Sequence, residues 1–162
     1  MSVHPGFRDL YEREFDRVFR AVYVLAGDRA LAEDATQEAF ARALARWRRI
    51  GAHPAPAGWV TTTALNVARR QLRRRPQAAP ASEVRARDDD ERLALREAIG
   101  SLPARQQEAV VLHYLVDLPV ADVATAMGID EGTVKTHLFR ARTAIATALA
   151  EPVTDPTEEL TP

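Results

Sequence analysis

Residues 119–149 read PVADVATAMGIDEGTVKTHLFRARTAIATAL, and their apolar spacing predicts two helices joined by a sharp turn. The apolar residues of the first, short helix share one face: Val120, Val123, Ala124 and Met127. Gly128 follows at once, and glycine tolerates the left-handed conformation that such a turn needs. Ile129 can fill the corner, and Asp130 can cap the second helix. This order of features is typical of a helix-turn-helix.

The second helix of this unit has an apolar face and a polar face. Its apolar residues are spaced four, three and four positions apart: Val134, Leu138, Ala141 and Ile145. Hydroxyl and cationic side chains lie on or beside the other face: Thr133, Lys135, Thr136, Arg140, Arg142 and Thr143. Such side chains can contact phosphates or base edges, so we interpret this as a DNA recognition helix. The alternative is a helical hairpin with a solvated outer face, but the short first helix, the glycine corner and the Thr/Lys/Arg face together favour DNA.

Upstream of this unit, residues 76–90 separate two stretches of helical periodicity. They contain prolines, small residues and charges, and they show no apolar period. We interpret them as a flexible linker, which can separate two modules without fixing their orientation. We therefore expect an all-α fold of two small helical domains, at 1–75 and 91–150, followed by a disordered tail at 151–162.

The first domain is expected to contain three helices. Apolar residues recur at helical spacing over 7–26, and again from a stop and restart at Gly27 and Asp28 as far as Trp47. The prolines in 51–56 cannot continue a helix, so a third helix begins after them. One side of that helix is apolar. The other side carries polar and basic residues: Trp59, Thr62, Asn66, Arg69, Arg70 and Arg73.

Ahead of the helix-turn-helix, the second domain is expected to begin with two further helices. The first covers about 91–99, and the second resumes through 106–115 after a break. Ser101 is predicted to be the N-cap of that second helix, with Pro103 at an early helical position.

Composition narrows the class of protein. Hydrophobic residues make up 46% of the chain and charged residues 28%, which is enough apolar material for packed cores. There is no cysteine, no signal peptide and no apolar run of membrane-spanning length, so we expect a cytoplasmic protein. The net charge is −1, so DNA contacts have to come from local basic patches. The four histidines are scattered and no catalytic motif is present, so we expect no enzyme activity, no metal and no cofactor.

The chain closely resembles bacterial sigma factors of the extracytoplasmic-function (ECF) group of the sigma-70 family. Residues 132–142, GTVKTHLFRAR, resemble sigma region 4. Residues 32–40, AEDATQEAF, together with Trp59 and Asn66, resemble sigma region 2. Other transcription activators also have helices similar to region 4 at their C-terminal end. The order of a region 2-like module, a linker and this helix-turn-helix, however, is specific to the family.

The resemblance implies an alternative sigma factor that binds core RNA polymerase, through its β′ and β subunits, and directs promoter recognition and DNA melting. The residues implied to dock on the β′ coiled coil are Glu33, Asp34, Gln37 and Glu38, for which a solvated acidic face is the alternative. Those implied to bind the −10 element and the melted strand are Trp59, Asn66, Arg69, Arg70 and Arg73. Those implied to bind the −35 element are Thr133, Lys135, Thr136, Arg140 and Arg142.

Some roles and functions stay open at this stage. Trp59 could instead be a core residue, and Arg142 could hold either a phosphate or an internal ion pair. The loop at 49–57 is where the family captures a flipped-out base, but its sequence here assigns no pocket. Many members are inhibited by an anti-sigma factor, so such a partner is possible. The competing functions are a helix-turn-helix regulator that does not replace sigma, and an interaction module that never touches DNA.

Overall fold

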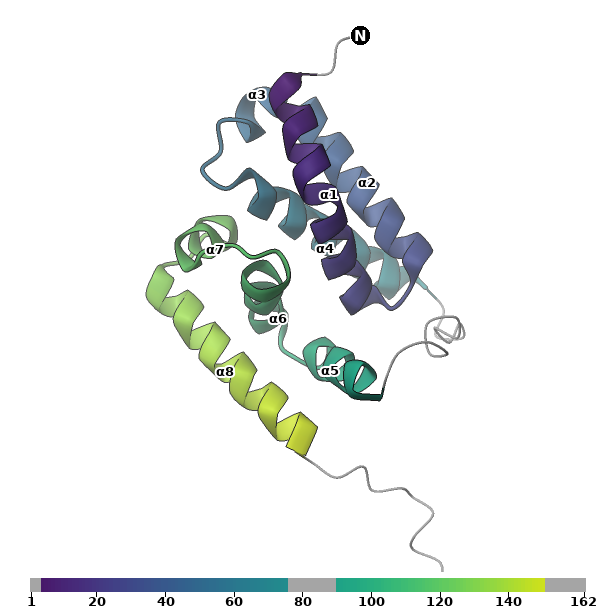
Figure 1. Ribbon diagram of the computed structural model, residues 1–162, viewed down its shortest axis with the longest axis vertical. Helices are drawn as coiled ribbons and strands as arrows, with labels where there is room; N and C mark the ends of the chain where they lie inside the picture. Colours follow the sequence, from purple (N-terminus) through teal and green to yellow (C-terminus); the bar gives the residue numbers. More distant parts are fainter. Residues whose placement is uncertain (1–3, 76–89, 151–162) are drawn as a thin grey trace, which may run out of the picture.

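The computed structural model describes residues 4–75 and 90–150, and all regular secondary structure in these two ranges is helical (Figure 1). The first module, residues 4–75, contains α1 (Pro5–Ala26), α2 (Arg29–Ala45), α3 (Trp47–Ile50) and α4 (Pro56–Arg74). The second module, residues 90–150, contains α5 (Asp90–Gly100), α6 (Ala104–Val110), the π-helical segment η1 (Val111–Leu115), α7 (Val120–Met127) and α8 (Glu131–Ala150). The predicted all-α fold is confirmed. The predicted linker, apart from Asp90, and the predicted tail lie outside the described residues.

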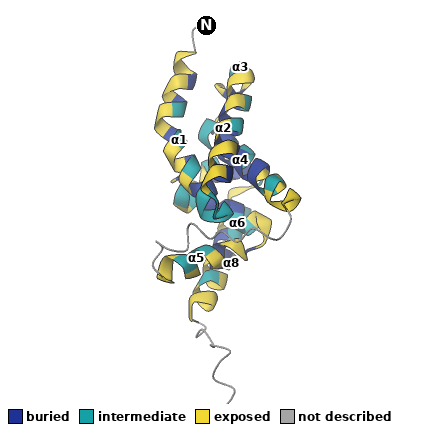
Figure 2. Cartoon of the chain, turned by 90° about the vertical axis from the view of Figure 1, so that its right-hand side faces the viewer, coloured by how far each residue is buried: buried dark blue, intermediate teal, exposed yellow. Residues whose placement is uncertain are grey.

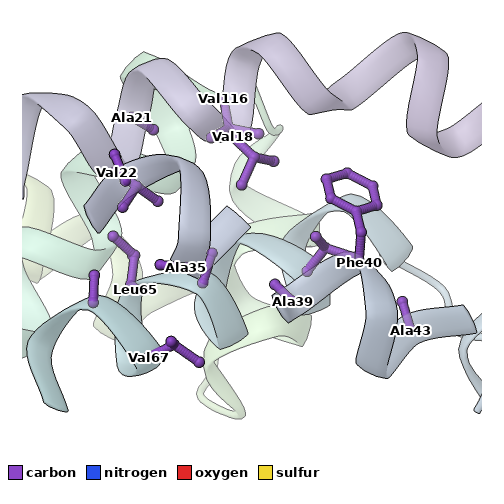
Figure 3. Close-up of a cluster of buried hydrophobic side chains, with 14 of the residues drawn as sticks. Val18, Ala21, Val22, Ala35, Ala39, Phe40, Ala43, Leu65, Val67 and Val116 are labelled. Carbon is purple, nitrogen blue, oxygen red and sulfur yellow. The ribbon is translucent and has the colours of Figure 1, made fainter. Parts of the chain in front are cut away.

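The core of the first module lies between α1, α2 and α4 (Figure 3). Four alanines of α2 are fully buried or nearly so: Ala32, Ala35, Ala39 and Ala43. Because these side chains are small, the backbones of α1 and α4 can approach α2 closely. At one end Phe40 is 1% exposed and contacts the rings of Phe7, Tyr11 and Phe15. Figure 2 shows that the outer side of α1 is exposed, as expected for an amphipathic helix.

The core of the second module lies beneath α8. Val134, Leu138 and Ala141 are buried there, as their spacing predicted, and Ile145 packs at the edge. They contact Val123, Ala124 and Met127 of α7, together with buried residues of α6 and η1. The apolar side of α8 thus fixes which of its faces is presented to solvent.

The helix ends follow the predicted signals. Gly27 and Gly128 both adopt the left-handed conformation, with φ of 65° and 67°. Asp28 accepts a hydrogen bond from the Leu31 amide, and Asp130 accepts one from the Thr133 amide, so each carboxylate caps the helix that follows it. Ile129 packs against the second core at the corner. The predicted turn of the helix-turn-helix is confirmed.

Two local predictions are wrong. The second helix does not run through Trp47: α2 ends at Ala45, and Trp47 begins the short α3. The break lets the indole pack edge-on against Phe7 and donate to His4 Nδ1 over 2.9 Å, contacts with a distant segment that local spacing cannot show. Ser101 is also not the N-cap of α6, because Pro103 holds that position; the Ser101 hydroxyl and amide instead donate to the Glu97 carbonyl and close the last turn of α5.

The two modules pack against each other, which the linker reading did not predict. Val111 and Val116 are buried in the core of the first module, whereas Leu112 belongs to the core of the second. The wider turn of the π-helical η1 carries this segment between the two cores. In the described ranges, no helix combines the length and the apolar character required to cross a bilayer.

Candidate nucleic-acid interface

The first turn of α8 is fixed by its capping carboxylate. Asp130 accepts from the Thr133 amide over 2.8 Å and from the Thr133 hydroxyl over 2.9 Å. These two hydrogen bonds, the backbone one first, hold the pKa of the Asp130 carboxyl below its ordinary value. The Thr133 hydroxyl is therefore held in one orientation, with its oxygen still able to accept a hydrogen bond from outside.

Beyond this turn, α8 presents an exposed polar face. Lys135, Thr136 and Arg140 are exposed, and in the described part of the chain the two cations make no salt bridge. Arg142 is exposed too, but its guanidinium donates to the Tyr114 hydroxyl over 2.7 Å. Within the described residues Arg142 thus has a phenol as its partner and no ion pair, and its possible contact with a phosphate stays a prediction. The Lys135 and Arg140 side chains are free to contact a ligand, and the Thr136 hydroxyl, which donates to the Gly132 carbonyl over 3.1 Å, can still accept a hydrogen bond.

Sequence reasoning missed Phe139 on the same helix. Its side chain is 64% exposed, which is the largest exposure among the large hydrophobic residues that the structure describes. It lies between Leu138, which is buried, and Arg140. The signal was present, because position 139 does not fit the apolar spacing of the helix, yet the residue is aromatic.

The basic side of α4 is partly exposed. Asn66, Arg70 and Arg73 are exposed, whereas Trp59 is half-buried and packs against the first core. The interpretation of Trp59 as a core residue therefore holds for part of its surface, and the remainder is accessible to solvent.

Arg69 differs from the other arginines of α4. Its guanidinium donates to the Gln107 side-chain oxygen over 2.9 Å and to the Ala104 carbonyl over 3.4 Å, both in the second module. Burial lowers the pKa of Arg69, and the nearby Glu108 carboxylate opposes that shift. The Arg69 guanidinium is thus already hydrogen-bonded within the protein, unlike a side chain that is free to bind a ligand.

A second basic surface, which sequence reasoning missed, lies where α2 meets α3. Arg46, Arg48 and Arg49 line an open hollow of about 610 Å³ together with His4 and Trp47. No salt bridge involves these three arginines within 4–75 and 90–150. The sequence RWRR carried the signal, but only the break between α2 and α3 gathers these residues around one hollow.

The acidic residues predicted on α2 are exposed. Glu33, Asp34 and Gln37 face solvent, and Glu38 pairs with Arg42 one turn further along the helix. In Figure 1 α2 and α8 lie on opposite sides of the molecule, with α4 and α6 between them. The candidate residues thus form three separate surfaces, on α2, α4 and α8, and not a single pocket. Within the described ranges no group of His, Cys, Asp or Glu side chains could hold a metal ion.

Both modules of the chain match models of known protein families. Residues 10–77 match the family model for Sigma-70 region 2, and residues 92–145 match the model for Sigma-70, region 4. The chain is 33% identical to the ECF RNA polymerase sigma factor SigL of Mycobacterium tuberculosis in an alignment of 159 residues, and the match covers 89% of each chain. This chain is an ECF sigma factor by family. The resemblance read from its motifs is confirmed.

Two further ECF sigma factors are similar but longer. The chain is 34% identical to BldN of Streptomyces coelicolor and 32% identical to SigE of Mycolicibacterium smegmatis, each over 164 residues. These matches cover 90% and 91% of this chain, yet only 61% and 63% of the two relatives. Sigma factors are transcription initiation factors and are not known as enzymes.

Solved structures share the fold. CnrH, solved in complex with the cytosolic domain of CnrY, superposes with a TM-score of 0.71 at 21% identity, over 88% of this chain and 86% of that one. RpoE of Bartonella quintana, solved with the anti-sigma factor NepR, superposes with a TM-score of 0.67 at 21% identity, over 88% of this chain and 96% of that one. In this ECF sigma factor, α2 and α4 fall within the region 2 match and α8 begins within the region 4 match.

Proposed function

We propose that this chain is an alternative sigma factor: it binds core RNA polymerase and directs promoter recognition and DNA melting. One observation carries the proposal, namely that a region 2 module and a region 4 module occur in one chain and that each presents an exposed basic helix face. The partners are the β′ and β subunits of core polymerase and promoter DNA, so the protein works in the cytoplasm. The anti-sigma partner of RpoE in its solved complex supports a similar regulator here.

On this proposal, α8 reads the −35 element in the major groove. Arg140 reads a base edge or a phosphate, Lys135 binds phosphate, and the Thr133 and Thr136 hydroxyls contact the backbone or bases. Phe139 adds an apolar contact with a thymine methyl group, for which its exposure next to Arg140 is the support. Arg142 contacts a phosphate of the DNA backbone at the end of this surface, since the residue is exposed even though its guanidinium donates to the Tyr114 hydroxyl.

The exposed side of α4 binds the −10 element and the melted strand. Arg69, Arg70 and Arg73 neutralise phosphates, while Asn66 can bond to a base edge. The half-buried Trp59 leaves part of its side chain accessible, and an accessible aromatic ring can stack on an unpaired base. These are the interactions that single-stranded DNA accepts without a closed pocket.

The exposed acidic face of α2 binds the coiled coil of the β′ subunit. Glu33, Asp34 and Gln37 are free to pair with cationic or polar groups of a partner, and Glu38 can exchange its bond with Arg42 for one across the interface. Such an exchange of exposed charges changes association rate and specificity more than it changes affinity.

The test is transcription in vitro from genomic fragments, with purified core polymerase in the presence and absence of the protein, and with start sites mapped by sequencing. New starts preceded by a shared two-part motif support the proposal. Core binding with no new starts points to a regulator that does not replace sigma, and no binding to core overturns the proposal.

A further inference from the structure

The arginines around the hollow where α2 meets α3 have no part in the proposed function. Arg46, Arg48 and Arg49 line this hollow of about 610 Å³, and all three residues are exposed. Within residues 4–75 and 90–150 none of them forms a salt bridge. Because the whole chain carries a net charge of −1, three neighbouring cations without a carboxylate partner indicate a local site for a polyanion.

The break between α2 and α3 holds the backbone of these arginines in place. Arg46 is the C-cap of α2, and its carbonyl accepts from the Arg49 and Ile50 amides over 2.9 Å each, which closes the single turn of α3. Ile50 is 2% exposed and belongs to the first core, so this turn is anchored in that core. When a ligand binds, only the arginine side chains have to be ordered, which lowers the entropic cost of binding.

Trp47 gives the hollow a fixed aromatic wall. Its indole packs edge-on against Phe7, with ring centres 5.6 Å apart, and donates to His4 Nδ1 over 2.9 Å. It also lies so close to Gly51 that a Cβ atom added there would be 2.9 Å from the ring. Trp47 is nevertheless only half-buried, and Leu44, which also lines the hollow, is 43% exposed. The hollow therefore combines accessible apolar surface with cations, as sites for single-stranded nucleic acids do.

His4 adds a hydrogen-bond donor to the same hollow. Because its Nδ1 accepts from the Trp47 indole, the proton of the neutral imidazole is on Nε2. An Nε2–H group can donate to a phosphate oxygen. The chemistry of the site is therefore suited to a nucleotide, with phosphates against the arginines and the histidine, and with a base against Trp47 and Leu44.

The position of the hollow favours a DNA strand as the source of this nucleotide. Residues 51–55 join α3 to α4, so the end of α3 lies at most about 20 Å from the start of α4. Figure 1 shows this loop leading from α3 to the start of α4, the helix that is proposed to bind the −10 element and the melted strand. About six nucleotides cover that distance at the duplex rise of about 3.4 Å, and fewer are needed when the strand is extended.

We propose that this hollow binds the melted strand immediately downstream of the −10 element, with Arg46, Arg48 and Arg49 on its phosphates and Trp47 against a base. The inference rests on the proposed function of α4, because the strand reaches the hollow from that helix. The DNA between the −10 and −35 elements stays duplex, so only the downstream part of the strand enters the hollow as a single strand. A strand bound there is kept from pairing again, which prolongs the melted state of the promoter.

The first test measures the hollow by itself, in the free full-length chain. The chain contains two tryptophans, so Trp59→Phe leaves Trp47 as the only indole. A single-stranded oligonucleotide of twelve thymidines should quench the fluorescence of Trp47. Combining Arg48→Ala with Arg49→Ala should weaken this binding about three- to tenfold and should reduce the slope of log K against log salt by about 0.7 for each lost phosphate contact. No quenching at low salt overturns the site.

The matched control is Arg20→Ala combined with Arg92→Ala, which removes the same charge elsewhere. Both residues are exposed, neither lines the hollow, and neither forms a salt bridge in the part of the chain that the structure describes. The control should bind the thymidine oligonucleotide within about twofold of the parent. Equal weakening by the two double variants would reflect net charge alone and overturns the site.

The second test asks whether the promoter strand reaches the hollow in the holoenzyme. Two forked fragments of a mapped promoter are compared, whose non-template strand either ends at the −10 element or extends six nucleotides further downstream. The extension should raise the affinity of the parent and of the control, and this gain should be about three- to tenfold smaller for the Arg48 and Arg49 double variant. An equal gain in all three proteins overturns the strand path.

Three further outcomes separate this inference from its alternatives. Weaker binding of the Arg48 and Arg49 double variant to core polymerase itself would assign these arginines to the polymerase and overturns the DNA contact. Quenching of Trp47 by ATP, with no gain from the extension, would assign the hollow to a free nucleotide and overturns the strand. If the double variant binds the thymidine oligonucleotide more weakly but neither fork binds to the holoenzyme, the hollow stands as a single-strand site and the proposed role of α4 fails.

Discussion

The two helices that are proposed to bind DNA differ in how much of their basic face is in contact with the rest of the protein. On α8 the exposed face carries Lys135, Thr136 and Arg140, and none of them contacts the first module in the described residues. On α4 the corresponding face is shared with α6, which holds Arg69. Both helices show the same basic and amphipathic pattern in the sequence. The comparison teaches that such a pattern identifies a binding face without indicating what occupies it.

The largest expected effect separates the two faces of α8 itself. Leu138→Ala removes a buried side chain from the second core and should lower the free energy of unfolding by about 2–5 kcal/mol. Phe139→Ala, at the next residue, should change it by no more than about 0.5 kcal/mol, because the ring is mostly exposed. Urea unfolding measures both. A large loss of stability in Phe139→Ala would show that this ring is part of the core.

The contrast between α8 and α4 can be tested with one arginine from each. Arg140→Ala should weaken binding to a −35 fragment by about 1–3 kcal/mol, because an unoccupied side chain is lost. Arg69→Ala should weaken binding to a −10 fragment less than that, because it removes a phosphate contact and also loosens the contact with Gln107. Titration at fixed salt measures both, with Lys135→Ala expected to reduce the salt dependence at −35. If Arg69→Ala has the larger effect, α4 is as free as α8.

The acidic face of α2 provides a third point of comparison, because its predicted partner is a protein. Charge reversal of Asp34 and Glu38 to lysine should weaken binding to core polymerase about tenfold, since like charges would meet across the interface. Reversal of Asp16, an exposed carboxylate on α1, is the control. Competition with a labelled sigma factor measures the affinity. Unchanged binding by the Asp34 and Glu38 variant would show that this face is only a solvated surface and does not bind polymerase.

The smallest expected effect concerns the cap of α2. The Leu31 amide and the Arg75 guanidinium hold the pKa of the Asp28 carboxyl below its ordinary value of 3.8. A lowered pKa in the folded state means that this stabilisation is present above about pH 4 and is lost as the pH falls through the folded-state pKa. Asp28→Asn should keep the cap and remove this part of the acid sensitivity. Thermal unfolding between pH 3 and 7 measures it, and an unchanged acid dependence would assign the loss to other carboxylates.

Part of the fold could be predicted because it depends on local spacing. The glycine corner at Gly128 and the cap at Asp130 require only neighbouring residues, and both are confirmed. The break before Trp47 could not be predicted, because its cause is a contact with His4 and Phe7 at the other end of the module. The candidate faces on α2 and α8 were predictable for the same local reason: polar residues at helical spacing lie opposite apolar ones.

The sequence by itself determined the helical class, the position of the helix-turn-helix and the family. These follow from periodicity, capping residues and motif order, all of which act over a few residues along the chain. Only the tertiary structure decided that η1 joins the first core, that Arg69 is occupied by Gln107, and that Phe139 is exposed. The physical reason is that burial and pairing depend on residues that are distant in the chain. Arg69 and Gln107 are 38 residues apart in the chain, and no local signal indicates that these two side chains meet.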